Sequence, residues 1–399
     1  MNAISANQGR TFQQLLAELR PFFRTDRNLP ARIQQRLTRE RRFGSRDRRL
    51  YRELLYTAVR FLPWLEEREA VSELHALEAI IALASPIPAV APLKAALGGG
   101  LSELPPTVAE KARVLGVQGS LVPAWTAEQC PPAAVSPNLD LLHTRASLWL
   151  RLQTAHPESV LEEFQNRGWS WRASTVLPDA IEVLSDADVT SMDAFKHGRF
   201  EVQDLGSQLL LASVAPSPGQ RWLDACAGAG GKTLQLARLV GPSGSVAAHD
   251  IRSAALEELV ARARRAALTN VSIAARPSGV FDGVLVDAPC SGTGTWRRSP
   301  HLKWCTSAES IHEAARVQQT LLTQFSAHVA PGGWLVYATC SLCREENEGV
   351  IETFLAAHPE FAPLHSKNTF GGEQSASGLT FWPAIHNTDG FFVAALRRR

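Results

Sequence analysis

The sequence predicts an α/β protein in which a doubly wound, Rossmann-like domain follows a small α/β module and an all-helical N-terminal domain. Three observations support this prediction. Apolar residues recur at helical spacing through the first 130 residues. From residue 201 onward, short apolar runs alternate with amphipathic segments, a pattern typical of a parallel sheet covered by helices. A Gly-rich turn follows the first of these runs. We therefore place the domains at 1–130, 140–200 and 201–399.

Helices are expected to fill the N-terminal domain. From Ser45 onward, apolar side chains fall on one helical face, with Ser45 as a candidate N-cap and Asp47 in the first turn. Further helices are expected over 66–83 and 103–114. The Pro-containing segment 131–145 is expected to be a linker.

The periodicity then changes to that of strands alternating with helices. The small module is expected to contain strands over 147–152 and 175–184 and a helix over 157–166. The larger domain is expected to contain strands over 221–226, 245–250, 281–289 and 334–339, and helices over 232–240, 254–268, 307–329 and from about 345. In sheets of this kind, ligands bind beyond the carboxyl ends of the strands.

The charge of the chain is unevenly distributed. The 399 residues carry 41 Lys and Arg against 39 Asp and Glu, a net charge of +2, but residues 1–60 hold 14 Arg and 5 acidic residues, a net charge of +9. Arginine suits bidentate contacts with phosphate, so this region is expected to bind a nucleic acid backbone, with Arg46, Arg48 and Arg49 among the contacts. A solvated basic helix face is the alternative.

Several classes of protein are excluded by composition. The first ten residues lack the apolar core of a signal peptide, and the most apolar stretch, 79–93, is short and interrupted by three prolines. Six cysteines in 399 residues are too few for a disulfide scaffold, and their spacing matches no metal site. We therefore expect a cytoplasmic monomer that binds neither a membrane nor a metal.

The Gly-rich turn joins a strand to a helix, where backbone amides and close backbone approach favour an electronegative ligand. A P-loop for nucleotide phosphates would need glycine at position 226, where the chain has Cys226. The other functional reading is a loop for an adenosyl cofactor, with Asp250 at the end of the next strand to hold the ribose hydroxyls. A tight turn with no ligand is the structural alternative.

Two cysteines each follow a predicted strand. Cys290 stands in Asp287-Ala-Pro-Cys290, and Cys340 stands between Thr339 and Ser341. If the two strands are neighbours, both thiols face one cleft. A helix beginning near 345 would lower the pKa of the Cys340 thiol through its N-terminal field. One alternative is that both thiols are buried and inert. Another is that Cys340 and Cys343 form a redox or zinc-binding pair, but we regard Cys343 as incidental.

Taken together, LDACAGAGGKT, DAPCSGTGTWRRSPHLKW and YATCSLCREENE resemble, in order and spacing, the motif set of the RsmB/Sun RNA (cytosine-5) methyltransferases, over roughly 140–399. The resemblance implies a class I methyltransferase domain. The segment 140–200 resembles the RRM-like module that precedes the catalytic domain. FGSRDRRLYRELLYTAVRFLPWL is similar to the NusB-like helical domain of the bacterial ribosomal-RNA members.

The resemblance implies S-adenosylmethionine as methyl donor and an RNA cytosine as acceptor. It implies that Cys340 attacks C6 of the base, that Cys290 assists product release, and that Asp287 bonds the edge of the cytosine. Arg297 and Arg298 would contact RNA phosphates. The residues implied in cofactor binding are Asp224, Cys226, Ala227, Gly228, Ala229, Gly230, Gly231, Lys232, Asp250 and Asp287.

The chain departs from the family pattern at two functional places. Ala229 stands where the family usually has proline, which should cost loop rigidity. No acidic residue stands in 271–281, where the family usually has one near the adenine.

From the resemblance as a whole, we expect a methyltransferase acting on small-subunit (16S) ribosomal RNA. Two alternatives remain: a tRNA cytosine-5 methyltransferase, or an RNA-binding ribosome assembly factor with weak or lost cofactor binding.

Overall fold

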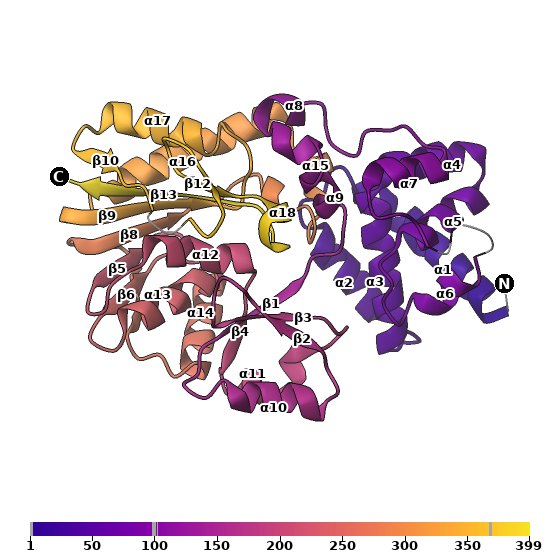
Figure 1. The fold of residues 1–399 in the computed structure, drawn as a ribbon, viewed down its shortest axis with the longest axis horizontal. Helices are drawn as coiled ribbons and strands as arrows, with labels where there is room; N and C mark the ends of the chain where they lie inside the picture. Colours follow the sequence, from indigo (N-terminus) through magenta and orange to yellow (C-terminus); the bar gives the residue numbers. More distant parts are fainter. Residues whose placement is uncertain (1–2, 98–100, 102, 367–368) are drawn as a thin grey trace. The chain divides into compact units, whose positions relative to one another are not determined.

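The computed structural model describes residues 3–97, 101, 103–366 and 369–399, and it divides into two compact units (Figure 1). The helical unit comprises Met1–Arg145 and Thr295–Ala308, and the α/β unit comprises Ala146–Gly294 and Glu309–Arg399. Within the described ranges, no helix is long and apolar enough to cross a bilayer.

The helical unit is built around the apolar faces of its first helices. Phe12, Leu15, Phe23, Leu54 and Leu55 are among the fully buried residues of this core. Its elements are α1 (Ala3–Leu19), η1 (Arg20–Phe22), α2 (Leu29–Arg39), α3 (Ser45–Arg60), α4 (Leu62–Val71), α5 (Glu73–Leu83), α6 (Ala91–Ala95), α7 (Val108–Leu115), α8 (Thr126–Gln129), η3 (Pro131–Ala134), α9 (Asn138–Leu142) and α15 (Leu302–Cys305).

Three predictions for this unit were wrong in detail. Helix α3 begins at Ser45, but its N-cap is Gly44, whose amide donates to the Asp47 carboxylate at 3.0 Å. The expected helix over 66–83 is two helices, because Ser72 is extended and its hydroxyl accepts the amide of His75 to cap α5. The expected linker over 131–145 contains η3 and α9 and belongs to the helical unit.

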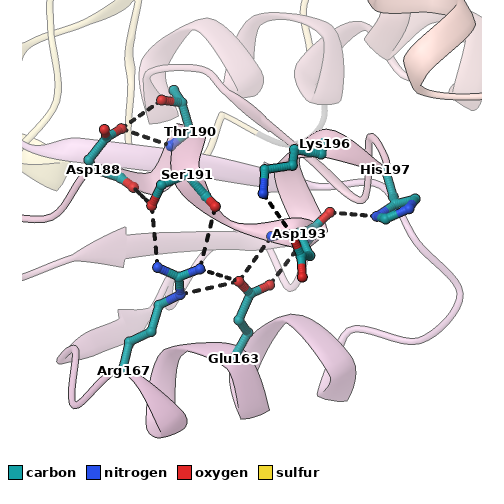
Figure 2. Close-up of polar contacts among 9 residues, drawn as sticks. Glu163, Arg167, Asp188, Thr190, Ser191, Asp193, Lys196 and His197 are labelled. Atoms are coloured by element: carbon teal, nitrogen blue, oxygen red, sulfur yellow. Dashed lines mark hydrogen bonds and ion pairs between the residues drawn. The ribbon is translucent and has the colours of Figure 1, made fainter.

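The small module of the α/β unit is a four-stranded antiparallel sheet in the order β2-β3-β1-β4. Its elements are β1 (Leu148–Leu152), α10 (Glu158–Asn166), β2 (Trp171–Ala173), β3 (Ala180–Val183), η4 (Val189–Ser191), α11 (Asp193–Lys196) and β4 (Phe200–Val202). Figure 2 shows how its helices are tied together. Glu163 on α10 accepts the amides of Asp193 and Ala194, both at 3.0 Å, and also pairs with Arg167.

The large sheet has the order β11-β12-β13-β9-β8-β5-β6-β7, with β10 paired to β13. Its strands are β5 (Arg221–Asp224), β6 (Ser245–Ala248), β7 (Val271–Ile273), β8 (Phe281–Asp287), β9 (Val329–Thr339), β10 (Phe361–Pro363), β11 (Glu373–Gln374), β12 (Leu379–Phe381) and β13 (Phe391–Arg398). Strands β5 to β9 pair in parallel, and β13 is antiparallel to β9. The alternating strands and helices of the sequence thus form the expected doubly wound sheet.

Helices cover both faces of this sheet (Figure 1). Alternate residues of one strand face opposite cores: Trp222 packs with α12 and α13, and Leu223 packs with the core of α16 and α17. A Cβ on Gly283 would lie 2.4 Å from the Trp222 ring, so this strand position requires glycine. The helices are α12 (Leu205–Val214), α13 (Gly231–Val240), α14 (Ser253–Arg265), α16 (Ala308–Ser326), α17 (Glu348–Ala357) and α18 (Pro383–His386).

Candidate active site

The side chains that the sequence predicts at the site stand at, or just after, the carboxyl ends of strands that are neighbours in the sheet. β5 ends at Asp224, β8 ends at Asp287, and β9 ends at Thr339, directly before Cys340. Asp250 follows β6. Because β9, β8, β5 and β6 are consecutive and parallel, their carboxyl ends form one edge, the position at which such sheets bind ligands.

The Gly-rich turn between β5 and α13 needs two left-handed glycines. Gly228 has φ +53° and Gly230 has φ +91°, and a Cβ on Gly230 would lie 2.7 Å from Leu259. The Gly228 amide donates to Asp250 at 2.8 Å. Gly228, Ala229 and Gly231 remain partly exposed, so the turn offers its backbone to a ligand.

Asp250 is ionised at neutral pH. Hydrogen bonds from the Arg252 guanidinium and from the backbone amides of Arg252 and Gly228 lower the pKa of its carboxyl to about 2. The Arg252 side chain is 67% exposed, whereas that of Asp250 is 5% exposed. An anionic acceptor therefore lies beside the turn, with a solvent-facing cation over it.

Asp224 lies deeper than expected for a direct cofactor contact. Its carboxylate is fully buried and accepts the Thr233 hydroxyl at 2.7 Å, and burial raises its pKa to about 7. Asp224 therefore supports the turn from inside the protein. Burial and the neighbouring carboxylates, Asp224 first among them, raise the pKa of Cys226, which stays a neutral thiol.

A brace that the sequence did not predict holds the turn. Arg262 on α14 donates to the Ala229 carbonyl at 2.7 Å and pairs with Glu201 of β4 at 2.9 Å. Arg265 also pairs with Glu201, whose side chain is 2% exposed. Arg262, held by Glu201, thus restrains the turn at Ala229, where the family resemblance implies a proline. No local pattern could have indicated it, because Glu201 and Arg262 are 61 residues apart.

The two cysteines lie together. The Cys290 and Cys340 sulfurs are 3.3 Å apart. The hydrogen bond with Cys340, followed by burial, raises the pKa of Cys290 well above its ordinary value, so Cys290 holds a proton. Helix α17 begins at Glu348, eight residues after Cys340, and the expected effect of its N-terminal field on the Cys340 thiol stays a prediction.

Lys232 and Asp287 form an ion pair at the same edge of the sheet. The Lys232 ammonium lies 2.7 Å from the Asp287 carboxylate, and their side chains are 11% and 30% exposed. Lys232, at the start of α13, therefore pairs with the carboxylate of the last residue of β8. The Lys232 ammonium nitrogen also lies 5.8 Å from the centre of the Phe391 ring.

The predicted RNA-contacting arginines are not equivalent. Arg297 is 2% exposed and donates to the Arg145 carbonyl at 2.9 Å, inside the helical unit. A phosphate contact by Arg297 is therefore contradicted, because its guanidinium is used to hold the chain. Arg298, Arg46 and Arg49 are exposed, and Arg48 is half-buried.

Comparison with known proteins assigns the family. Residues 211–397 match the family described as 16S rRNA methyltransferase RsmB/F. The chain is 30% identical over 398 residues to the ribosomal RNA small subunit methyltransferase B of Erwinia tasmaniensis, an alignment that covers 88% of the chain and 91% of that relative. The chain belongs to the RsmB/F methyltransferase family.

Other relatives of this RsmB/F protein align over a shorter part. It is 34% identical over 265 residues to the enzyme of the same name from Cronobacter sakazakii, which covers 64% of the chain and 60% of that relative. Among solved structures, PH0851 has a TM-score of 0.72 at 22% identity and covers 92% of the chain and 93% of its own. NSun6 from Pyrococcus horikoshii, solved with SFG, has a TM-score of 0.59 at 20% identity, and the alignment covers 65% of this chain and 93% of NSun6. These likenesses confirm the fold class.

Proposed function

We propose that this RsmB/F protein is an S-adenosylmethionine-dependent RNA (cytosine-5) methyltransferase that acts on small-subunit (16S) ribosomal RNA. The reaction would pass through a covalent bond between Cys340 and C6 of the target cytosine. The observation that carries the proposal is the pair of thiols 3.3 Å apart after adjacent strands, at the sheet edge that also holds the Lys232–Asp287 pair. The names of the curated relatives support ribosomal RNA as the substrate.

The Gly-rich turn and Asp250 fit the methyl donor of this family, S-adenosylmethionine. Nothing lies within 4 Å of a Cβ built on Gly231, so there is room beside the turn. Asp250 would accept ribose hydroxyls once the exposed Arg252 side chain turned away, and Gly228 and Ala229 would contact the ligand through their backbone. When bound, the donor supplies an electrophilic methyl group.

The Arg262 brace should strengthen donor binding. Without it, the Ala229 carbonyl loses its donor and the turn becomes looser, so we expect Arg262→Ala to weaken S-adenosylmethionine binding by about tenfold, or about 1.4 kcal/mol. Calorimetry on the full chain measures this. The exposed Arg264→Ala, on the same helix, is the matched control. Equal affinities for both variants would contradict the role of the brace.

The protein groups have separate tasks in the proposed reaction. The thiolate of Cys340 adds to C6 of a cytosine that has left its stack, and C5 becomes nucleophilic and takes the methyl group. Asp287, held by Lys232, would bond the polar edge of the base. In the adduct, the Cys340 sulfur is a neutral thioether, so the charge of Cys340 no longer raises the pKa of Cys290. Cys290 can then lose its proton to solvent and remove the C5 proton, and the S–C6 bond breaks as the C5–C6 double bond re-forms.

Bisulfite sequencing of ribosomal and transfer RNA from a deletion strain tests the function. We expect one protected cytosine of 16S ribosomal RNA to become unprotected and to be restored by the wild-type gene. A change confined to tRNA would instead assign the tRNA activity. No change, together with no calorimetric binding of S-adenosylmethionine, would favour the assembly factor.

The helical domain at 1–130 would bind the RNA backbone, and the chain would further comprise the small module at 140–200 and the methyltransferase domain at 201–399. Arg46 and Arg49 are exposed near the start of α3, and Arg298 is exposed after the Cys290 loop. Neutralising a phosphate contact reduces the salt dependence of binding, because fewer counterions are released.

We therefore expect Arg46→Ala/Arg49→Ala to reduce the slope of log K against log salt by about 1.4 to 1.8. Filter binding of 16S ribosomal RNA between low and moderate salt measures the slope. The control is Arg264→Ala/Arg316→Ala, two exposed arginines of the α/β unit. An unchanged slope in the first variant would mean that these arginines form a solvated face only.

A further inference from the structure

A carboxylate that the mechanism above does not use lies beneath the two cysteine loops. Glu346 stands in the loop between β9 and α17 and has no exposed surface. Ionised side chains are seldom buried unless several donors compensate them. We therefore expect several hydrogen-bond donors around the Glu346 carboxylate.

Each cysteine is followed by a serine, and both serines bond to Glu346. The Oε1 atom accepts the amide of Ser291 at 2.7 Å, and the Oε2 atom accepts the Ser341 hydroxyl at 2.5 Å. The Ser291 hydroxyl also donates to Oε2. One carboxylate thus holds the residue after Cys290 and the residue after Cys340.

Glu346 is itself held in place from the helix side. Gln318 of α16 donates its amide to Oε1 at 3.0 Å, and the Tyr337 hydroxyl lies 2.5 Å from the Glu346 carbonyl oxygen. All three of these residues are fully buried. The carboxylate is therefore a fixed point relative to the sheet and not a mobile surface group.

We propose that Glu346 is a positioning residue that sets the distance between the Cys290 and Cys340 sulfurs by joining their two loops. It does not contact substrate, because it has no exposed surface and both oxygens already accept hydrogen bonds. The catalytic consequence rests on the proposed function, since that function gives the thiols their roles. The geometric part stands without it.

Two properties make a carboxylate suitable here. Hydrogen bonds to an ionised acceptor are shorter and stronger than neutral ones, so they restrict the two loops more tightly. The charge of Glu346 also contributes to the raised pKa of Cys290, after the hydrogen bond with Cys340 and burial. Glutamine keeps the length but not the charge, whereas alanine loses every contact.

The geometry can be tested without any methylation assay. Diamide takes two electrons and two protons from neighbouring thiols and leaves a disulfide, so the rate of Cys290–Cys340 crosslinking in the folded full chain reports how the sulfurs are held. Peptide mass spectrometry identifies the bond. The variants are Glu346→Ala and Glu346→Gln, and the control is Glu345→Gln, because Glu345 is the adjacent, partly exposed residue paired with His312.

We expect crosslinking to slow about tenfold in Glu346→Ala and less in Glu346→Gln, with Glu345→Gln like wild type. In methylation assays, a displacement on the order of 1 Å should lower kcat by about 10²-fold in Glu346→Ala, with little change in the KM for RNA. Wild-type crosslinking rates in both Glu346 variants would overturn the proposal.

Two further outcomes are distinguishable. If crosslinking slows in the Glu346 variants but the wild-type protein methylates no RNA, the positioning role stands and the proposed function fails. If Glu346→Ala does not fold, as judged by thermal unfolding, Glu346→Gln and Ser341→Ala decide the matter. Crosslinking rates in these two equal to those of wild type would overturn the proposal.

Discussion

Cys290→Ala should remain covalently attached to its RNA, whereas Cys340→Ala should form no adduct and should lose methyl transfer by about 10⁴-fold or more. Without Cys340 there is no thiolate to add to C6, and C5 stays a poor nucleophile. Without Cys290 the addition and methylation can proceed, but the group that removes the C5 proton is missing. The adduct then persists, because the S–C6 bond breaks only as the C5 proton leaves.

The measurement is a denaturing gel of protein incubated with 16S ribosomal RNA and S-adenosylmethionine, in which the adduct migrates as an RNA-dependent slow band. Cys305→Ala is the matched control, because Cys305 is a partly exposed thiol of the helical unit outside the site. An adduct in Cys340→Ala with none in Cys290→Ala would exchange the two roles.

The thiol pair illustrates what sequence could predict. Cys290 and Cys340 are 50 residues apart, yet each follows an apolar run with strand character, and the alternation of strands and helices implies a parallel sheet. Since β8 and β9 are neighbours with Asp287 opposite Ala338, the two loops must meet. The same reasoning from parallel strands predicts that Lys232, Asp250 and Asp287 lie at one edge of the sheet.

What the sequence did not predict depends on burial and on long-range partners. Arg297 lies in a basic, Pro-containing segment that resembles an exposed RNA loop, yet its guanidinium is buried and bonded to the Arg145 carbonyl. Glu346 belongs to a charged run, in which nothing local distinguishes the one carboxylate that turns inward. The end of one helix and the start of the next at Ser72, within the expected helix 66–83, were missed. A capping residue can separate two helices while the apolar residues on either side keep helical spacing.

The second large effect concerns the Lys232–Asp287 pair. Asp287→Ala should lower kcat by about 10²- to 10³-fold, because the base loses the carboxylate that would accept its amino group and hold C6 in line with the Cys340 thiolate. Lys232→Met should lower kcat less, since Asp287 remains but is no longer held by the ammonium 2.7 Å away. Single-turnover methylation of 16S ribosomal RNA at saturating donor measures both. Asp282→Ala, an exposed carboxylate at the opposite end of β8, is the control.

The double variant separates a shared role from two separate ones. If Lys232 acts through Asp287, then removing Asp287 makes Lys232 dispensable, and Lys232→Met/Asp287→Ala should be no slower than Asp287→Ala alone. The interaction free energy should then be about 1 to 3 kcal/mol, as for contacting charged groups. Strictly additive losses would instead mean that the ammonium and the carboxylate contact different parts of the reacting complex. In that case Lys232 would contribute through its own contact with substrate or donor.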